Sequence, residues 1–138
     1  MPSNTALDPG QVLQIASYLN AIGNIIRNIL NDPNVVLSND QSNLLSSDLI
    51  SISNVAANLS TWAAQVVFAD SDSAFDNISN ATQVASTKLQ SLQKDVAKMS
   101  SILNIVADVV NLGVAFGTGN VAGILSASSS LYGDASSS

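Results

Sequence analysis

Few residues in this chain have side chains capable of acid–base, nucleophilic or metal chemistry. The chain has ten Asp residues and no Glu, His or Cys, so the commonest general base and the thiol nucleophile are absent. Half of the Asp residues lie where we predict helix ends, and a carboxylate there favours the helix dipole or caps free backbone N–H groups; these are Asp8, Asp32, Asp40, Asp70 and Asp72. We therefore expect a non-enzymatic protein with no catalytic site and no cofactor.

Three closely spaced carboxylates, Asp70, Asp72 and Asp76, are the best candidate for a cation site. A calcium loop needs several oxygen ligands around a Gly turn, and an EF-hand adds a bidentate Glu. The segment Asp70-Ser71-Asp72-Ser73 has neither the Gly nor the Glu. We therefore expect these carboxylates to cap helices, and we expect no metal site.

The charge balance restricts the possible partners. The net charge is −6, with Arg27, Lys88, Lys94 and Lys98 as the basic residues. Nucleic-acid binding depends on clustered Lys and Arg, so we expect no nucleic acid partner. Simple electrostatic docking on anionic lipid is disfavoured for the same reason. Around Asp95 the three lysines predict a solvated helix face with weak ion pairs, and the alternative is a basic docking patch.

The compartment is weakly indicated. Without Cys, the chain can form neither disulfides nor thiolate metal sites. The first residues, Met1-Pro2-Ser3-Asn4, lack the basic and apolar regions of a signal peptide. The low charge and the abundance of Ser and Asn favour an exported, extracellular protein over the alternatives, and the compartment stays open.

Apolar residues repeat at heptad spacing in three segments, and this is the strongest structural signal in the chain. The first segment runs from Val12 to Ile29, after a helix start at Asp8-Pro9 and before a stop at Pro33. The second segment runs from Leu45 to Val66. Each segment predicts an amphipathic helix with one apolar face.

The third segment is the longest. Its apolar step continues from Phe75 to Val110, and no Gly or Pro interrupts residues 73–112. It predicts a single helix of roughly forty residues, about 60 Å long at 1.5 Å per residue. After a Gly-rich break, a short fourth helix is expected from Val121 to Tyr132.

These elements predict an all-α protein with one domain over residues 1–138. The expected architecture is an antiparallel bundle of three long helices and a short C-terminal fourth helix, with flexible ends at residues 1–8 and 133–138. Ser, Asn, Asp and β-branched residues are mediocre helix formers, so the helices must be stabilised by packing of their apolar faces.

The region most informative about function is residues 102–127, whose only charged residue is Asp108. Apolar residues outside the heptad positions make its helix apolar over most of the circumference, so the helix must be covered on several sides. Small residues four apart also permit close approach of another backbone. The candidate contact residues are Ile102, Ile105, Val109, Leu112, Gly113, Phe116 and Gly117.

Three kinds of cover are possible for this region: the other helices of the chain, a second subunit or partner protein, or lipid. A plain transmembrane helix is not expected, because Asn104, Asp108, Asn111 and several glycines interrupt the apolar run. We predict a non-enzymatic interaction module that forms a homo-oligomer or binds a partner protein. The alternative is a membrane-active or lipid-binding protein, of pore-forming type, that uses residues 102–127.

Overall fold

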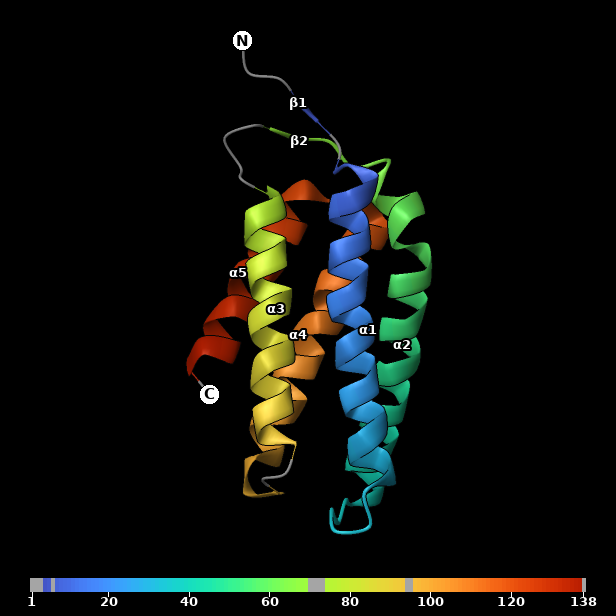
Figure 1. Cartoon of the computed structure of the whole chain (residues 1–138), viewed down its shortest axis with the longest axis vertical. Coiled ribbons are helices and arrows are strands. Elements are labelled where there is room, and N and C mark those ends of the chain that lie inside the picture. Colours follow the sequence, from blue (N-terminus) through green and yellow to red (C-terminus); the bar gives the residue numbers. More distant parts are fainter. Residues whose placement is uncertain (1–3, 6, 70–73, 94–95, 138) are drawn as a thin grey trace.

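Five α-helices make up most of the structure, a computed structural model that describes residues 4–5, 7–69, 74–93 and 96–137. The helices are α1 (Pro9–Asn31), α2 (Asn39–Ala63), α3 (Ala74–Leu92), α4 (Met99–Thr118) and α5 (Val121–Ser137). A 3-10 turn, η2 (Val96–Lys98), precedes α4. Two short strands, β1 (Asn4–Thr5) and β2 (Phe68–Ala69), pair antiparallel at one end of the bundle (Figure 1).

The first two helices begin with capping boxes. The Asp8 side chain accepts a hydrogen bond from the backbone N–H of Gln11 at 2.8 Å, and the Gln11 side chain accepts one from the Asp8 N–H at 3.0 Å. Ser38 and Gln41 make the same reciprocal pair at the start of α2. Such caps satisfy backbone donors that have no partner inside the helix, so the predicted helix start at Asp8 is confirmed.

The single helix predicted for residues 73–112 is wrong, because the structure divides this segment into α3 and α4. A continuous helix would reach about 60 Å, whereas a helix of 23 residues such as α1 reaches about 35 Å at 1.5 Å per residue. Much of the apolar face of such a long helix would then extend past the ends of the neighbouring helices and would not be covered by them. Reversal after Leu92 instead brings both halves of the segment against the rest of the bundle.

The helices enclose the core in a ring. Successive helices run in opposite directions along the bundle (Figure 1). Going round the bundle, α1 lies beside α2, α2 beside α4, α4 beside α5, α5 beside α3, and α3 beside α1. Buried apolar residues from all five helices form one cluster. The predicted all-helical bundle is therefore confirmed, whereas its division into three long helices and a short fourth is not.

The predicted flexible ends also differ from the structure. Residues 133–137 continue α5, and the side chain of Ala135 is fully buried. Near the other end, Asn4–Thr5 pairs with Phe68–Ala69, and Asp8 caps α1. Packing of α5 against α3 and α4 explains the longer helix, because tertiary contacts stabilise sequences of low intrinsic helix propensity.

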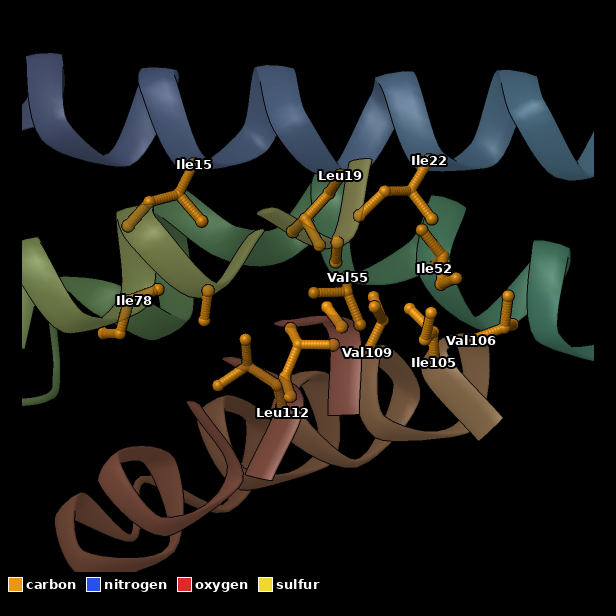
Figure 2. Packing of buried hydrophobic residues seen from close by; sticks show 14 of the residues in the cluster. Ile15, Leu19, Ile22, Ile52, Val55, Ile78, Ile105, Val106, Val109 and Leu112 are labelled. Carbon is orange, nitrogen blue, oxygen red and sulfur yellow. The ribbon is translucent and has the colours of Figure 1, made fainter. Parts of the chain in front are cut away.

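Figure 2 shows side chains of α4 that point into the interior of the bundle. Ile105, Val109 and Leu112 point towards the apolar residues of α1 and α2, among them Leu19 and Val55. All five of these side chains are buried. These three residues of α4, which the sequence singled out, therefore lie in the core.

Candidate functional site

Six of the seven candidate contact residues are buried within the chain, and the seventh, Gly117, is exposed. The buried ones are Ile102, Ile105, Val109, Leu112, Gly113 and Phe116. Helices of the same chain thus cover the apolar region in this conformation. A partner or a lipid could reach these six residues only after α4 separates from its neighbours.

The two glycines of α4 both lie against α2. A Cβ atom added at Gly113 would lie 2.3 Å from Cγ2 of Val55. One added at Gly117 would lie 3.7 Å from the Cη2 atom of Trp62. The small residues predicted to allow close approach therefore serve packing between α4 and α2 in the same chain, and only Gly113 is too confined for a larger side chain.

The one charged side chain of α4, Asp108, faces α5 rather than open solvent. Its carboxyl group shares a side-chain hydrogen bond with Asp134 of α5. Its Oδ2 atom is buried and accepts no hydrogen bond from the described part of the chain. A hydrogen bond between two carboxyl groups requires that one of them holds a proton, so this contact favours the protonated form of one carboxyl group.

Burial is the main reason why the pKa of Asp108 is raised to about 7, and the hydrogen bond with Asp134 and its negative charge raise it further. Desolvation and a neighbouring carboxylate both disfavour the ionised form of an acid. Burial also raises the pKa of Asp48 on α2. Of these two groups, only Asp108 is paired with a second carboxyl group.

The sequence interpretation missed the role of Asp134 because it assigned residues 133–138 to a flexible end. One signal was available: Asp108 and Asp134 are the only charged residues between positions 99 and 137. Two carboxyl groups in an apolar hairpin can lie side by side at low cost only if one of them is neutral. That pattern marks both residues as unusual, but it does not predict that they are in contact.

Among the described residues, α4 is the helix that is long and apolar enough, by length and composition, to cross a membrane. Core helices of soluble proteins pass the same test; 44% of the apolar window of α4 is buried, and the share of buried residues in α4 is similar to that in α3. The exposed positions of α4 carry no charge; they are Ser100, Asn104, Ala107, Asn111, Val114, Gly117 and Thr118.

Two hollows lie between α3 and α5. One, of about 290 Å³, is lined by amide and hydroxyl side chains together with Leu125 and Tyr132. The other, of about 610 Å³, is lined by neighbouring residues of the same seam, including Lys88. Among the described residues that line the two hollows there is no carboxylate.

The predicted cation and lysine clusters are only partly described. Asp76 is exposed in the first turn of α3, while Asp70 and Asp72 lie outside the described residues. Within the described ranges, no group of three or more acidic side chains could hold a metal ion. Lys88 is half-buried on α3 and Lys98 is exposed beside α4, and Lys94 and Asp95 also lie outside the described residues.

The chain matches no protein-family model, and neither a curated protein nor a solved structure matches it.

Proposed function

We propose that this protein is a non-enzymatic helical bundle that binds lipid bilayers through its α4–α5 hairpin. The observation that carries the proposal is the character of α4. It is an apolar helix of 20 residues, less than half of its apolar window is buried, and its exposed side bears no charge. A helix of this kind is suited to place its apolar face, which the bundle covers, against lipid once it leaves the core.

The length of α4 and its division into a polar and an apolar face suit a helix that lies in the interface of a bilayer. At 1.5 Å per residue, its 20 residues extend for about 30 Å. Asn104, Asp108 and Asn111 lie at spacings of four and three and form one polar stripe. An amphipathic helix with a broad apolar face lies in the membrane interface with that face among the acyl chains.

Separation of α4 from the bundle in water would be too costly to occur by itself. Each of Ile102, Ile105, Val109, Leu112 and Phe116 is almost completely buried, and full burial of such a side chain contributes about 1.5–3 kcal/mol. Exposing all five side chains to water would cost a free energy comparable to the roughly 5–15 kcal/mol by which a domain is stable. The hairpin can therefore leave the core only if lipid replaces the lost apolar contacts.

The connection between α4 and α5 favours their movement as one unit. Gly119 adopts a left-handed conformation with φ of 72°, and Asn120 caps α5 by accepting a hydrogen bond from the N–H of Gly123 at 3.0 Å. Glycine adopts this backbone conformation without steric cost. A two-residue turn keeps the helices antiparallel and adjacent, so α5 remains against α4 while both move.

Self-association or binding of a partner protein is the other function that the sequence predicts. All of the contact residues expected for it except Gly117 are buried, so a partner would have to use mainly other surfaces. Exposed large apolar residues are spread over α1, α2, α4, α5 and the loops; they are Leu13, Val36, Leu44, Ile50, Val67, Val114 and Tyr132. Scattered exposed apolar side chains are normal on soluble proteins, and they do not favour this function.

An engineered disulfide between α2 and α4 tests the proposal. A Cβ atom at Gly113 would lie 3.3 Å from Cβ of Val55, close to the roughly 3.5–4.5 Å that disulfides require. The chain has no other Cys. We expect Val55→Cys/Gly113→Cys to float with phosphatidylcholine vesicles when reduced and to lose this binding when oxidised, because the disulfide holds α4 against α2.

Size-exclusion chromatography with light scattering distinguishes the two functions. Equal vesicle binding by the oxidised and reduced protein would show that α4 is not the lipid contact. A wild-type protein that ignores vesicles and elutes as a dimer or larger species would favour self-association. A monomer that ignores vesicles would contradict the proposed membrane function.

A further inference from the structure

We infer that the Asp108–Asp134 carboxyl pair is a proton-operated gate that permits transfer of the α4–α5 hairpin into lipid only when the pair holds a proton. The inference rests on the proposed membrane function and adds its regulation. It follows from the position of two carboxyl groups in one seam and from the absence of other charges on either helix.

The position of the pair makes it the main polar obstacle to transfer. Asp108 is the tenth of the 20 residues of α4, so it lies at the middle of the apolar helix. Asp134 is three residues before the end of α5 at Ser137. Because the seam between α4 and α5 contains both groups, a hairpin that moves as a unit carries them into the lipid together.

Among the described residues, no positive charge acts on Asp108. Helices α2, α3 and α5 and the turn η2 all contact α4, and their titratable or charged residues are Asp40, Asp48, Asp76, Lys88, Lys98, Tyr132 and Asp134. Of these groups, Asp134 is the one whose charge acts on Asp108. A charged carboxylate is costly to move into lipid, so proton uptake is the way in which this seam loses charge.

The direction and range of the pH dependence follow from linkage. The pKa of Asp108 in the bundle is about 7, and transfer into lipid raises it further because burial disfavours the ionised form. Transfer therefore takes up a proton only above about pH 7, where Asp108 in the bundle is ionised. The binding constant for lipid should be nearly constant below this pH and should fall by up to about tenfold for each pH unit above it.

Vesicle flotation between pH 5 and 9 tests the gate, with uncharged phosphatidylcholine vesicles and four proteins. The wild type should show a plateau at low pH and a decline above about pH 7. Asp108→Asn should lack the decline that begins at about pH 7, because the group that causes it is absent. Asp134→Asn should keep a decline but shift it to lower pH, because loss of the neighbouring charge lowers the pKa of Asp108.

Asp76→Asn is the matched control, because it removes the same charge from an exposed position on α3 and should keep the wild-type profile. Circular dichroism at each pH verifies that the variants stay helical. If Asp108→Asn binds vesicles with the wild-type pH profile, the gate is refuted and the membrane function stands. If neither the wild type nor Asp108→Asn binds at any pH, the membrane function fails and the gate fails with it.

Discussion

The contact between Gly113 of α4 and Val55 of α2 leads to a prediction with a definite sign. In Gly113→Ala, the new Cβ would lie 2.3 Å from Cγ2 of Val55, far inside the roughly 3.5–4.0 Å of a normal carbon contact. Val in a helix is held in essentially one side-chain rotamer, so Val55 cannot rotate away at low cost. We expect α2 and α4 to be pushed apart.

The magnitude is set by two opposing effects. Overpacking of this kind destabilises a core by about 1–3 kcal/mol, whereas Ala is favoured over Gly inside a helix by about 1 kcal/mol. Gly113→Ala should therefore lower the free energy of unfolding by about 1 kcal/mol. In a Val55→Ala background the obstructing methyl groups are absent, and the same substitution should raise that free energy. The two positions should thus be coupled by about 2 kcal/mol.

Urea denaturation of the two single variants, the double variant and the wild type measures this coupling. Gly133→Ala on α5 is the reference, because a Cβ there meets nothing within 4 Å, and it should stabilise the protein by about 0.5–1 kcal/mol. If Gly113→Ala stabilises the wild type as Gly133→Ala does, then α2 and α4 do not approach each other as described, and the proposed disulfide loses its geometric basis.

Three further substitutions test the capping, the core and the titration of the fold. Asp8→Ala should lower the free energy of unfolding by about 0.5–2 kcal/mol, because it removes the cap of α1; urea titration against the wild type checks this. Leu92→Ala should cost roughly 2–5 kcal/mol as a buried truncation, and an unchanged melting temperature would contradict that burial. For Asp108 the pKa is raised from 3.8 to about 7 on folding, so wild-type stability should decline as pH rises from about 4 to 7. Asp108→Asn should lack this part of the decline, so urea midpoints that differ equally from the wild type at pH 4 and pH 8 would refute it.

Heptad spacing predicted the helical segments well because it reports which residues share an apolar face. It could not locate the break between α3 and α4. Leu92 and Met99 are seven residues apart, so the pattern is the same whether the intervening residues form two helical turns or a reversal. No Gly or Pro marks the break. The available signal was global, because a helix of roughly 60 Å exceeds what α1 and α2 can cover.

The end of α5 was unpredictable from local propensity for a different reason. Gly133 and the serines that follow are poor helix formers, and local composition therefore favours a frayed end. Leu131 and Ala135 are nevertheless fully buried, and α5 contacts both α3 and α4 along the bundle. The same packing brings Asp134 to Asp108, so the carboxyl pair could be found only once the fold was known.

The chemistry of position 108 bears on whether the pair has a role beyond folding. A purely structural polar group in this seam could be Asn, which makes hydrogen bonds without an ionisable proton. With Asp at this position, Oδ2 is buried without a hydrogen bond from the described residues, and burial raises the pKa of the carboxyl group to about 7. The fold therefore loses stability as pH rises from about 4 to 7 because of this group, and an Asn at the same position would not titrate. Ionisable groups kept in such surroundings are concentrated at functional sites, which is why the pH profile of Asp108→Asn, in stability and in vesicle binding together, is the decisive measurement. An increase in stability accompanied by unchanged lipid binding would mean that Asp108 only weakens the bundle, whereas an increase in stability with loss of pH control would assign the carboxyl pair to function.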